Sequence, residues 1–414
     1  MSAIAGLRGT GDLGPDERPK DFREGILWFN PNGEAPIFAL SARAGKRVVK
    51  DPEFGWWNEG NALVRLRVSV AAVASDTLLT VDTADPTDTT LGANYGTATH
   101  LKPGDILMVE PLTSASESAL FAPEMVEVDN VLSDTQLTVK RGAGGSTPGN
   151  IAQNAYVTLI GSAYAEGTGA PKPVARNPIK FYNYTQIFKN TYELTGTLDK
   201  TKLRTGDAWS NDKKRKGYDH SRDIELSILF GRRSETVGEN GKPKRTMGGL
   251  RTFIPAANTT IFATATTPDS LIDAVAPVFD YNTGAGDTRI MFVGNQAAIE
   301  LGKIFNAATN IHINASERVK VYGIGFQEVL LPQGRLLIKT HPLMSRHGIY
   351  KKSAFVIDFE ALKWAPLEGR DTKARDDVQA EDEDVRRGYY MTEAGIEVGY
   401  GGLTMAYLGN ISKT

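Results

Sequence analysis

Histidine is scarce in this sequence and cysteine is absent, which limits the metal and nucleophile chemistry available to it. A chain without cysteine cannot form disulfides, thiolate nucleophiles or cysteine-based zinc sites. Only His220 has a carboxylate at helical spacing, Asp223, and two ligands do not make a metal site. We therefore predict surface or core positions for all histidines, and neither a metal nor another cofactor. The five are His100, His220, His312, His341 and His347.

Glycine and serine patterns give no catalytic motif either. Residues 142–147 lack the Gly-Lys-Ser/Thr ending of a phosphate loop, and no helical pattern follows, so we predict a β-turn. Gly323 and Gly325 lack the third glycine of a dinucleotide site. The Gly-x-Ser-x-Gly motif of α/β-hydrolases does not occur in the sequence. We predict that the protein is not an enzyme.

A run of basic residues could bind a charged ligand: Lys213, Lys214, Arg215 and Lys216. Such a run can contact phosphates weakly and without base specificity, or it can be only the solvated start of a helix. The net charge of −2 indicates that the chain as a whole is not a polycation. A stretch of mixed charge at residues 375–387 is either a solvated loop or an ion-pair element between copies of the chain.

The basic run lies at the start of a predicted helix at residues 211–234. Ser210, Asn211 and Asp212 are good N-cap residues. The first half of the helix is almost wholly polar, whereas the apolar residues of the second half cover more than one face. The helix should therefore face solvent at its start and be buried at its end. Those apolar residues are Ile224, Leu226, Ile228, Leu229 and Phe230.

Residues 61–165 alternate apolar and polar side chains, which is typical of half-buried strands. Residues 75–81 (SDTLLTV) recur as residues 133–139 (SDTQLTV). Each copy predicts a turn that leads into a strand, with Ser and Asp bonding the turn backbone. We predict a small antiparallel β-domain at about residues 66–160.

Residues 1–60 are predicted to form an extended N-terminal arm, because prolines interrupt any helical period. Large apolar side chains on an extended segment cannot bury one another. They should dock on another body, either the core of the same subunit or a neighbour. The aromatic candidates for such contacts are Trp28, Phe38, Phe54, Trp56 and Trp57.

The rest of the chain mixes helices and strands at residues 268–345 and has strands at 348–411. Together with the length of 414 residues, this predicts an α+β fold of two or three units. The N-terminus lacks the apolar core of a signal peptide, and no apolar run approaches the roughly 18 residues of a membrane span. We expect a chain that is cytosolic at synthesis and has no membrane partner.

This order of arm, β-unit, long helix, mixed unit and closing strands resembles the major capsid proteins of tailed bacteriophages with the Hong Kong 97 fold. It is most similar to the branch with a β-domain inserted ahead of the spine helix. The resemblance is strongest over about residues 160–255. Its motifs are residues 165–167 (AEG), 183–188 (NYTQIF), 195–197 (TGT) and 246–250 (TMGGL).

The resemblance implies a division of the chain into family parts. The N-terminal arm spans 1–60, and an extended loop at 61–165 carries the β insertion domain at about 66–160. Residues 166–245 contain the return of that loop and a peripheral domain with the spine helix at 211–234. An axial domain follows at 246–345, and residues 346–414 return to the peripheral domain.

The resemblance also implies a structural function. Copies of the chain would self-assemble as hexamers and pentamers into the icosahedral shell of a virion, around double-stranded DNA, in the cytoplasm of a bacterial host. Implied partners are a portal protein and a separate scaffolding protein, because the sequence before Pro15 is too short for a scaffolding helix. The basic run would face packaged DNA without base specificity, and the aromatic candidates would contact neighbouring subunits.

Two other classes of protein remain open on the sequence alone. A phage tail or surface adhesin would explain the β-unit but fits the long helix and the mixed unit poorly. An enzyme with an unrecognised site would need a carboxylate pair hidden among the 49 acidic residues. Electron microscopy of the purified protein separates these classes as shells or capsomers, fibres, or small oligomers.

Overall fold

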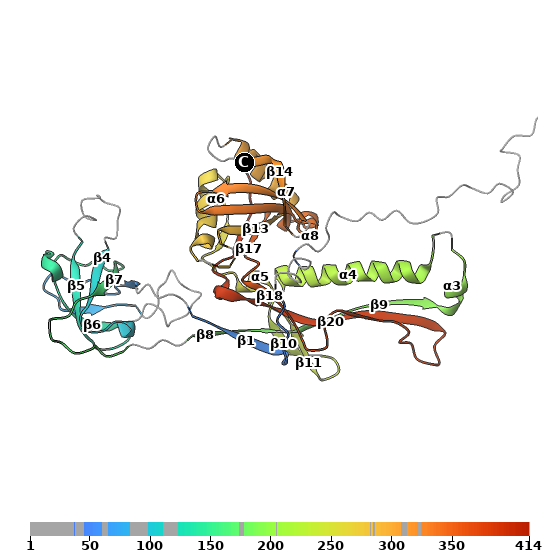
Figure 1. The fold of residues 1–414 in the computed structure, drawn as a ribbon, viewed down its shortest axis with the longest axis horizontal. Helices are drawn as coiled ribbons and strands as arrows, with labels where there is room; N and C mark the ends of the chain where they lie inside the picture. The colour runs from blue at the N-terminus through green and yellow to red at the C-terminus, as the bar shows by residue number, and fades with distance from the viewer. Residues whose placement is uncertain are drawn as a thin grey trace, which may run out of the picture.

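The computed structural model of the chain describes residues 37, 45–59, 65–82, 98–110, 123–173, 178–203, 205–281, 283–284, 286–307, 313–321 and 324–413. Trp28 and Phe38, two of the predicted aromatic contacts, lie outside the described residues, as does most of the predicted arm. Figure 1 shows three sheet-containing units: a small β-domain, a long sheet beside a long helix, and an α/β unit.

The α/β unit contains a seven-stranded sheet of order β12-β21-β17-β13-β16-β15-β14. β13 runs parallel to β16 and β12 parallel to β21, and the other neighbours are antiparallel. Helices α6 (Pro268–Val275) and α7 (Asn295–Ala307) share a core with β13 and β16. The strands are β12 (Thr259–Ile261), β13 (Thr288–Val293), β14 (Ile313–Val321), β15 (Ile324–Leu331), β16 (Gly334–Thr340), β17 (Ala354–Ile357) and β21 (Ala406–Gly409).

The α/β sheet corrects one predicted boundary. The sequence division returns residues 346–414 to the peripheral domain, yet β17 and β21 belong to the α/β sheet. The reason is burial: residues 289–293 of β13 are all buried, so their backbone amides and carbonyls cannot bond to water and need a strand on both edges. β16 covers one edge and β17 the other, and β21 extends the sheet beyond β17.

The second unit is a long sheet built around β20 (Val385–Val398). β9 (Gln186–Thr195) pairs along one edge, and β18 (Leu362–Pro366) and β19 (Lys373–Arg375) pair along the other. The long helix α4 (Ala208–Phe230) lies beside β9 (Figure 1). Its second half buries Ile224, Ile228 and Leu229 in the core beneath it, as the polar-then-apolar pattern predicts.

The observed helix is shifted from the predicted range of 211–234. It begins earlier because the Asp207 carboxylate, as N-cap, accepts a hydrogen bond from the Ser210 amide at 2.9 Å. It ends earlier because Gly231 leaves the helical conformation and residues 234–237 pair as a strand.

Two narrow elements extend from these units (Figure 1). β1 (Glu53–Asn58) and β8 (Ile179–Tyr184) form an antiparallel ribbon, and β10 (Ser234–Val237) and β11 (Pro243–Thr246) form a hairpin after α4. None of the helices in the described part of the chain is long and apolar enough to span a membrane. The short helices are α3 (Gly196–Lys200), α5 (Leu250–Phe253) and α8 (Pro342–Arg346), with single 3-10 turns at Ala98–His100, Ala143–Gly145, Ala276–Phe279, Tyr350–Lys352 and Gly399–Gly402.

The β-domain is a six-stranded antiparallel sheet of order β2-β7-β4-β5-β6-β3, in the range predicted for a small β-domain. Val68, just after β2, forms a bridge with Val81, just after β3, and the Ser69 amide donates to the Thr80 carbonyl at 2.9 Å. The two outer strands therefore meet, and the sheet closes as a small barrel. The strands are β2 (Arg65–Arg67), β3 (Leu78–Thr80), β4 (Asp105–Glu110), β5 (Met125–Val131), β6 (Gln136–Lys140) and β7 (Tyr156–Ser162).

The repeated heptapeptide occupies two neighbouring strands of this barrel. β3 and β6 pair antiparallel with Leu79 opposite Leu137, and both leucines are buried in the barrel core. In the first copy the Asp76 carboxylate accepts from the Val73 amide at 2.8 Å. In the second copy the Ser133 hydroxyl accepts from the Thr135 amide at 3.3 Å. The repeat is thus a turn–strand unit used twice.

Expressed alone, residues 65–162 should fold, because their hydrophobic core is separate from the other cores. We expect dispersed amide resonances and a cooperative melt. Leu137→Ala should lower the free energy of unfolding by roughly 3 kcal/mol, because the side chain is fully buried. Leu132→Ala, at a side chain that is 54% exposed, is the matched control and should have little effect. A featureless spectrum with no cooperative melt would contradict an independent domain.

Candidate functional site

The C-terminal end of α4 is a junction of several segments, and Asn183 of β8 holds them together. Its side-chain amide donates to the carbonyls of Gly248 and Ile396, at 3.0 and 2.8 Å, and its side-chain oxygen accepts from the Gly248 amide at 2.8 Å. The Gln186 side chain accepts from the Met247 amide at 3.1 Å. The motifs at 183–188 and 246–250 are therefore bonded to each other in the fold.

Two glycines allow the backbone to cross at this junction. The Gly249 amide donates to the Gly231 carbonyl at 2.8 Å. A Cβ on Gly249 would lie 2.5 Å from the Ser227 carbonyl oxygen and 2.7 Å from that of Ile228, both in the last turn of α4. These are backbone atoms that cannot shift without unwinding the helix, so the crossing requires glycine.

A buried polar contact joins α4 to the α/β unit. The Glu225 and His341 side chains are both fully buried, and His341 Nε2 donates to Glu225 Oε1 at 2.7 Å. His341 Nδ1 accepts from the Met344 amide as the N-cap of α8, so Nε2 carries the proton. The amide of Ile37, which is itself buried, also donates to Glu225 Oε1 at 2.9 Å. One carboxylate thus connects three parts of the chain.

His220 makes a second buried contact, between α4 and the long sheet. Its Nδ1 lies 2.7 Å from Asn190 Oδ1 on β9, and its Nε2 lies 2.7 Å from Thr392 Oγ1 on β20. Asn190 in turn donates to Asp223 at 2.9 Å. Burial lowers the pKa of His220 below its ordinary value, and the nearby Asp223 carboxylate opposes this only in part. The ring is therefore neutral near pH 7.

This lowered pKa predicts a pH dependence of stability. Below the ordinary value of 6.5 the unfolded chain binds the His220 proton more readily than the folded chain does. The stabilising contribution of His220 is complete above about pH 6.5 and is lost as the pH falls through the folded-state pKa. The difference in unfolding free energy between wild type and His220→Gln should therefore shrink from pH 7.5 to 5.5 in urea titrations. His347→Gln, at an exposed ring, is the control, and a pH-independent difference for His220→Gln would contradict this role.

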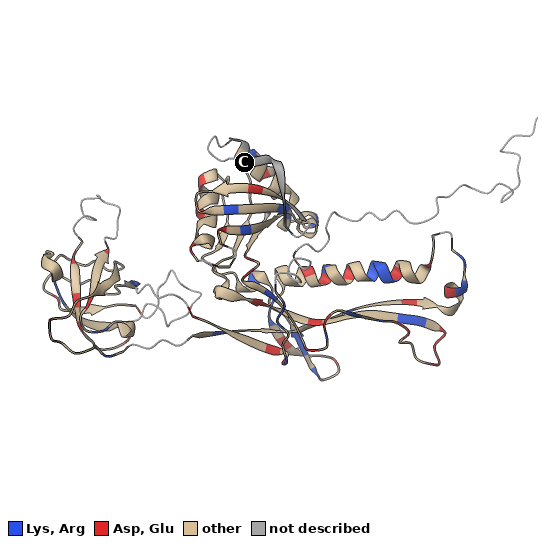
Figure 2. Cartoon of the chain, in the orientation of Figure 1, with Lys and Arg blue, Asp and Glu red and all other residues tan. Residues whose placement is uncertain are grey.

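The predicted basic run lies on the first half of α4, where Figure 2 shows basic and acidic residues interleaved. Carboxylates engage three of its members. Lys213 pairs with Asp376, Arg215 with Asp212 at 3.5 Å, and Lys216 with Asp219 at 3.3 Å. Lys214 and Arg215 are the most exposed positions of the run. The run is therefore partly neutralised by its own chain.

The mixed-charge stretch at 375–387 also pairs within the chain. Arg386 contacts Asp377 at 2.9 Å and Asp199 at 3.6 Å, and Arg387 contacts Glu193 at 3.0 Å. These pairs fold the loop back on β9 and α3. Arg386 and Arg387 thus have carboxylate partners within their own chain, and the ion-pair element between copies stays a hypothesis.

Three of the aromatic candidates, Phe54, Trp56 and Trp57, lie within the described residues, and all three are on strand β1 of the ribbon. Phe54 and Trp56 point into the core, where Trp56 packs against Phe253 at a ring distance of 5.7 Å. The prediction that these two side chains contact a neighbouring subunit is therefore wrong. Successive strand residues face opposite sides, so Trp57 points outward and is 65% exposed. It stays a predicted contact.

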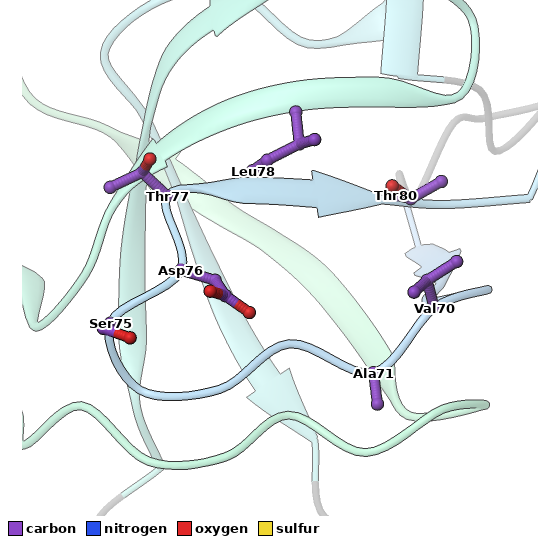
Figure 3. Close-up of a pocket in the computed structure, with 7 residues that line it drawn as sticks. All are labelled: Val70, Ala71, Ser75, Asp76, Thr77, Leu78 and Thr80. Atoms are coloured by element: carbon purple, nitrogen blue, oxygen red, sulfur yellow. The ribbon is translucent and has the colours of Figure 1, made fainter.

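A hollow on the β-domain lies between β3 and the loop before it (Figure 3). Its polar lining is hydroxyls and the Asp76 carboxylate, and that carboxylate already bonds the Val73 amide. The Asp76 carboxylate in the hollow is therefore part of a turn. Within the described residues, no cluster of three or more metal-ligating side chains occurs.

Asn183, Glu225 and His341 are the residues of the junction that the sequence does not predict as a group. Glu225 and His341 are 116 residues apart, and neither stands in a local motif of its own. Asn183 and the 246–250 segment do lie in motifs of the resemblance, which is the one available signal for their importance.

Comparison with known proteins finds similarity to phage major capsid proteins over most of the chain. A family model for the SU10 major capsid protein matches residues 6–411. A major capsid protein of Pseudomonas phage PaMx41 is 31% identical over 387 residues, covering 90% of this chain and 84% of that protein. Among solved structures, a chain of the cyanophage A-1(L) capsid asymmetric unit has a TM-score of 0.45 and 10% identity, covering 96% of this chain and 98% of that chain. A Microbacterium phage Oxtober96 chain has a TM-score of 0.43 and 10% identity, with coverage of 95% and 96%.

Proposed function

Because the chain belongs to the SU10 major capsid protein family, we propose that its copies form hexamers and pentamers that tile an icosahedral shell around double-stranded DNA. Membership makes the chain a phage major capsid protein and a component of the virion capsid. The observation that carries the proposal is the family match over residues 6–411. It supports the capsid interpretation and not the adhesin or the enzyme.

The shape of the subunit supports assembly. Its ribbon and hairpin carry large exposed apolar side chains, with Trp57 at 65% and Val237 at 77% exposure, and such groups on projecting segments mark partner contacts. In family terms we assign β1 and β8 to the extended loop, α4 to the spine helix, the β20 sheet to the peripheral domain, and the seven-stranded unit to the axial domain.

Electron microscopy of the purified full chain over a range of concentrations tests this proposal. We expect capsomers at low concentration and closed shells at high concentration. Particles that stay monomeric at every concentration, or that grow as fibres, would contradict it.

We further propose that the basic run faces packaged DNA. Lys214 and Arg215 would make the main phosphate contacts, because they are the most exposed positions of the run. Each contact would be weak, independent of sequence and sensitive to salt. A capsid interior whose basic side chains are partly neutralised by carboxylates would hold DNA loosely.

Replacing Lys213, Lys214, Arg215 and Lys216 by Gln should leave the assembly of empty shells intact. Full heads of this variant should lose DNA at a lower salt concentration than wild type, because fewer phosphates are neutralised. DNA release is measured by dye accessibility in a salt series, with exposed Lys172→Gln as the control. Identical release curves would leave the run as a solvated helix start.

The proposed assembly also includes a separate scaffolding protein and a portal protein, and takes place in the cytoplasm of a bacterial host. These partners follow from the family resemblance and have no residues assigned on this chain. Isolation of precursor shells from infected cells, followed by identification of their proteins, tests this part of the proposal. Precursor shells that contain this chain alone would contradict it.

A further inference from the structure

An exposed groove lies where the ribbon meets the turn after β20. Two large aromatic side chains line it, Trp57 at 65% and Tyr400 at 44% exposure. Glu59 and Glu360 also line the groove, and neither carboxylate has an ion-pair partner within the part of the chain that the structure describes. Exposed rings beside unpaired carboxylates favour a cationic side chain.

The backbone at Tyr400 is held in an unfavourable conformation. Its φ is +52°, and Gly401 and Gly402 follow at +61° and +77°. Glycine adopts this left-handed region freely, whereas a tyrosine there is strained. A strained position that keeps a ring in solvent suggests a role outside the isolated chain.

The hairpin β10–β11 is exposed and basic, which complements the acidic groove. All four residues of β10 are exposed, and Val237 at its end is 77% exposed. The segment 232–245 has five basic residues against two acidic ones, and neither Lys242 nor Lys244 has an ion-pair partner among the described residues. A two-stranded hairpin with no buried face is marginally stable in water, so a partner surface should cover it.

We propose that the hairpin of one copy docks in the Trp57–Tyr400 groove of a neighbouring copy, with Lys242 and Lys244 facing Glu59 and Glu360. The groove is acidic and the hairpin is basic. Each surface carries charged side chains that have no ion-pair partner among the described residues. Within one copy, Arg233 donates to the Tyr182 carbonyl at 2.6 Å and stacks on the Tyr182 ring, which fixes the base of the hairpin beside β8. The complementary charges of the two surfaces favour a second copy as the occupant of the groove. This contact rests on the proposed shell function and names two of its surfaces.

A charge exchange tests the contact. Glu59→Lys/Glu360→Lys and Lys242→Glu/Lys244→Glu should each lower the assembled fraction at least about tenfold in sedimentation velocity, because like charges would then meet. In an equimolar mixture the hairpin of each variant matches the groove of the other, so the assembled fraction should rise above that of either variant alone. All four substitutions in one chain should restore shells. Glu166→Lys/Lys172→Glu, at exposed positions outside both surfaces, is the matched control and should assemble like wild type.

A Tyr400→Gly variant separates assembly from folding. It relieves the left-handed strain while it removes the ring, so the thermal unfolding midpoint should stay near that of wild type while assembly weakens. Normal assembly of Tyr400→Gly or of either charge-reversed variant would overturn the contact, as would failure of the four-substitution chain to recover or loss of shells in the control. In each of these cases wild-type shells would still uphold the proposed function. If wild type itself formed no shells, that function would fail, and this contact with it.

Discussion

Replacing Gly249 by alanine is expected to destabilise the protein by roughly 4 kcal/mol or more, which places it among the most damaging single substitutions. The added Cβ would lie 2.5 Å from the Ser227 carbonyl oxygen and 2.7 Å from both the Gly231 nitrogen and the Ile228 carbonyl oxygen. All three atoms belong to backbone at or just beyond the end of α4, so relief requires the helix end to unwind. The Gly249–Gly231 hydrogen bond would then break as well. Denaturant unfolding of the unassembled chain measures this loss.

Gly302 of α7 provides the matched control, since a Cβ there would meet nothing within 4 Å. Gly302→Ala should be neutral or stabilising by about 0.5–1 kcal/mol, because alanine favours a helix interior. If Gly249→Ala unfolded at the same denaturant concentration as wild type, the crossing would not be as tight as described.

The second large effect is expected at Glu225. Glu225→Ala should cost roughly 3 kcal/mol, because it leaves His341 Nε2 and the Ile37 amide buried without their acceptor. His341→Ala should cost a similar amount, because it removes the imidazole donor from a buried carboxylate. Both variants should also loosen the α/β unit from α4, which hydrogen exchange at residues 224–229 would detect as faster exchange.

A double-mutant cycle shows whether these two residues act together. The Glu225→Ala/His341→Ala variant should lose less stability than the sum of the single losses, since the contact between the two side chains is lost only once. Glu381→Ala, at an exposed carboxylate, is the control and should change stability by less than about 0.5 kcal/mol. Strict additivity of the two losses would contradict a coupled pair.

Local patterns predict much of this fold. The α+β class is confirmed, and the alternation over residues 61–165 predicts strands where the barrel has them. The polar-then-apolar helix is present at residues 208–230, a few residues from its predicted bounds. These features depend on side chains close together in sequence, which periodicity reports directly.

The predictions that failed depend on distant partners. β17 looks like any buried strand, and only its pairing with β13 assigns it to the α/β sheet. Lys213 looks solvated in the sequence, but it pairs with Asp376, 163 residues away. Trp56 and Trp57 are adjacent and of the same type, yet strand alternation buries the first and exposes the second. The sequence marks the strand but does not say which face the core will cover.

Closure of the β-domain has a consequence for a protein made in many copies. An open sheet offers unpaired amides and carbonyls at its outer strands, and these can recruit a strand from the next molecule. Here the Val68–Val81 bridge and the Ser69–Thr80 hydrogen bond occupy the edges at which the sheet would otherwise end. Copies crowded together in a capsid therefore carry this domain without nucleating cross-β aggregates. Opening the seam, for example by Ser69→Pro, which removes the amide that donates to the Thr80 carbonyl, should make the domain a source of insoluble protein.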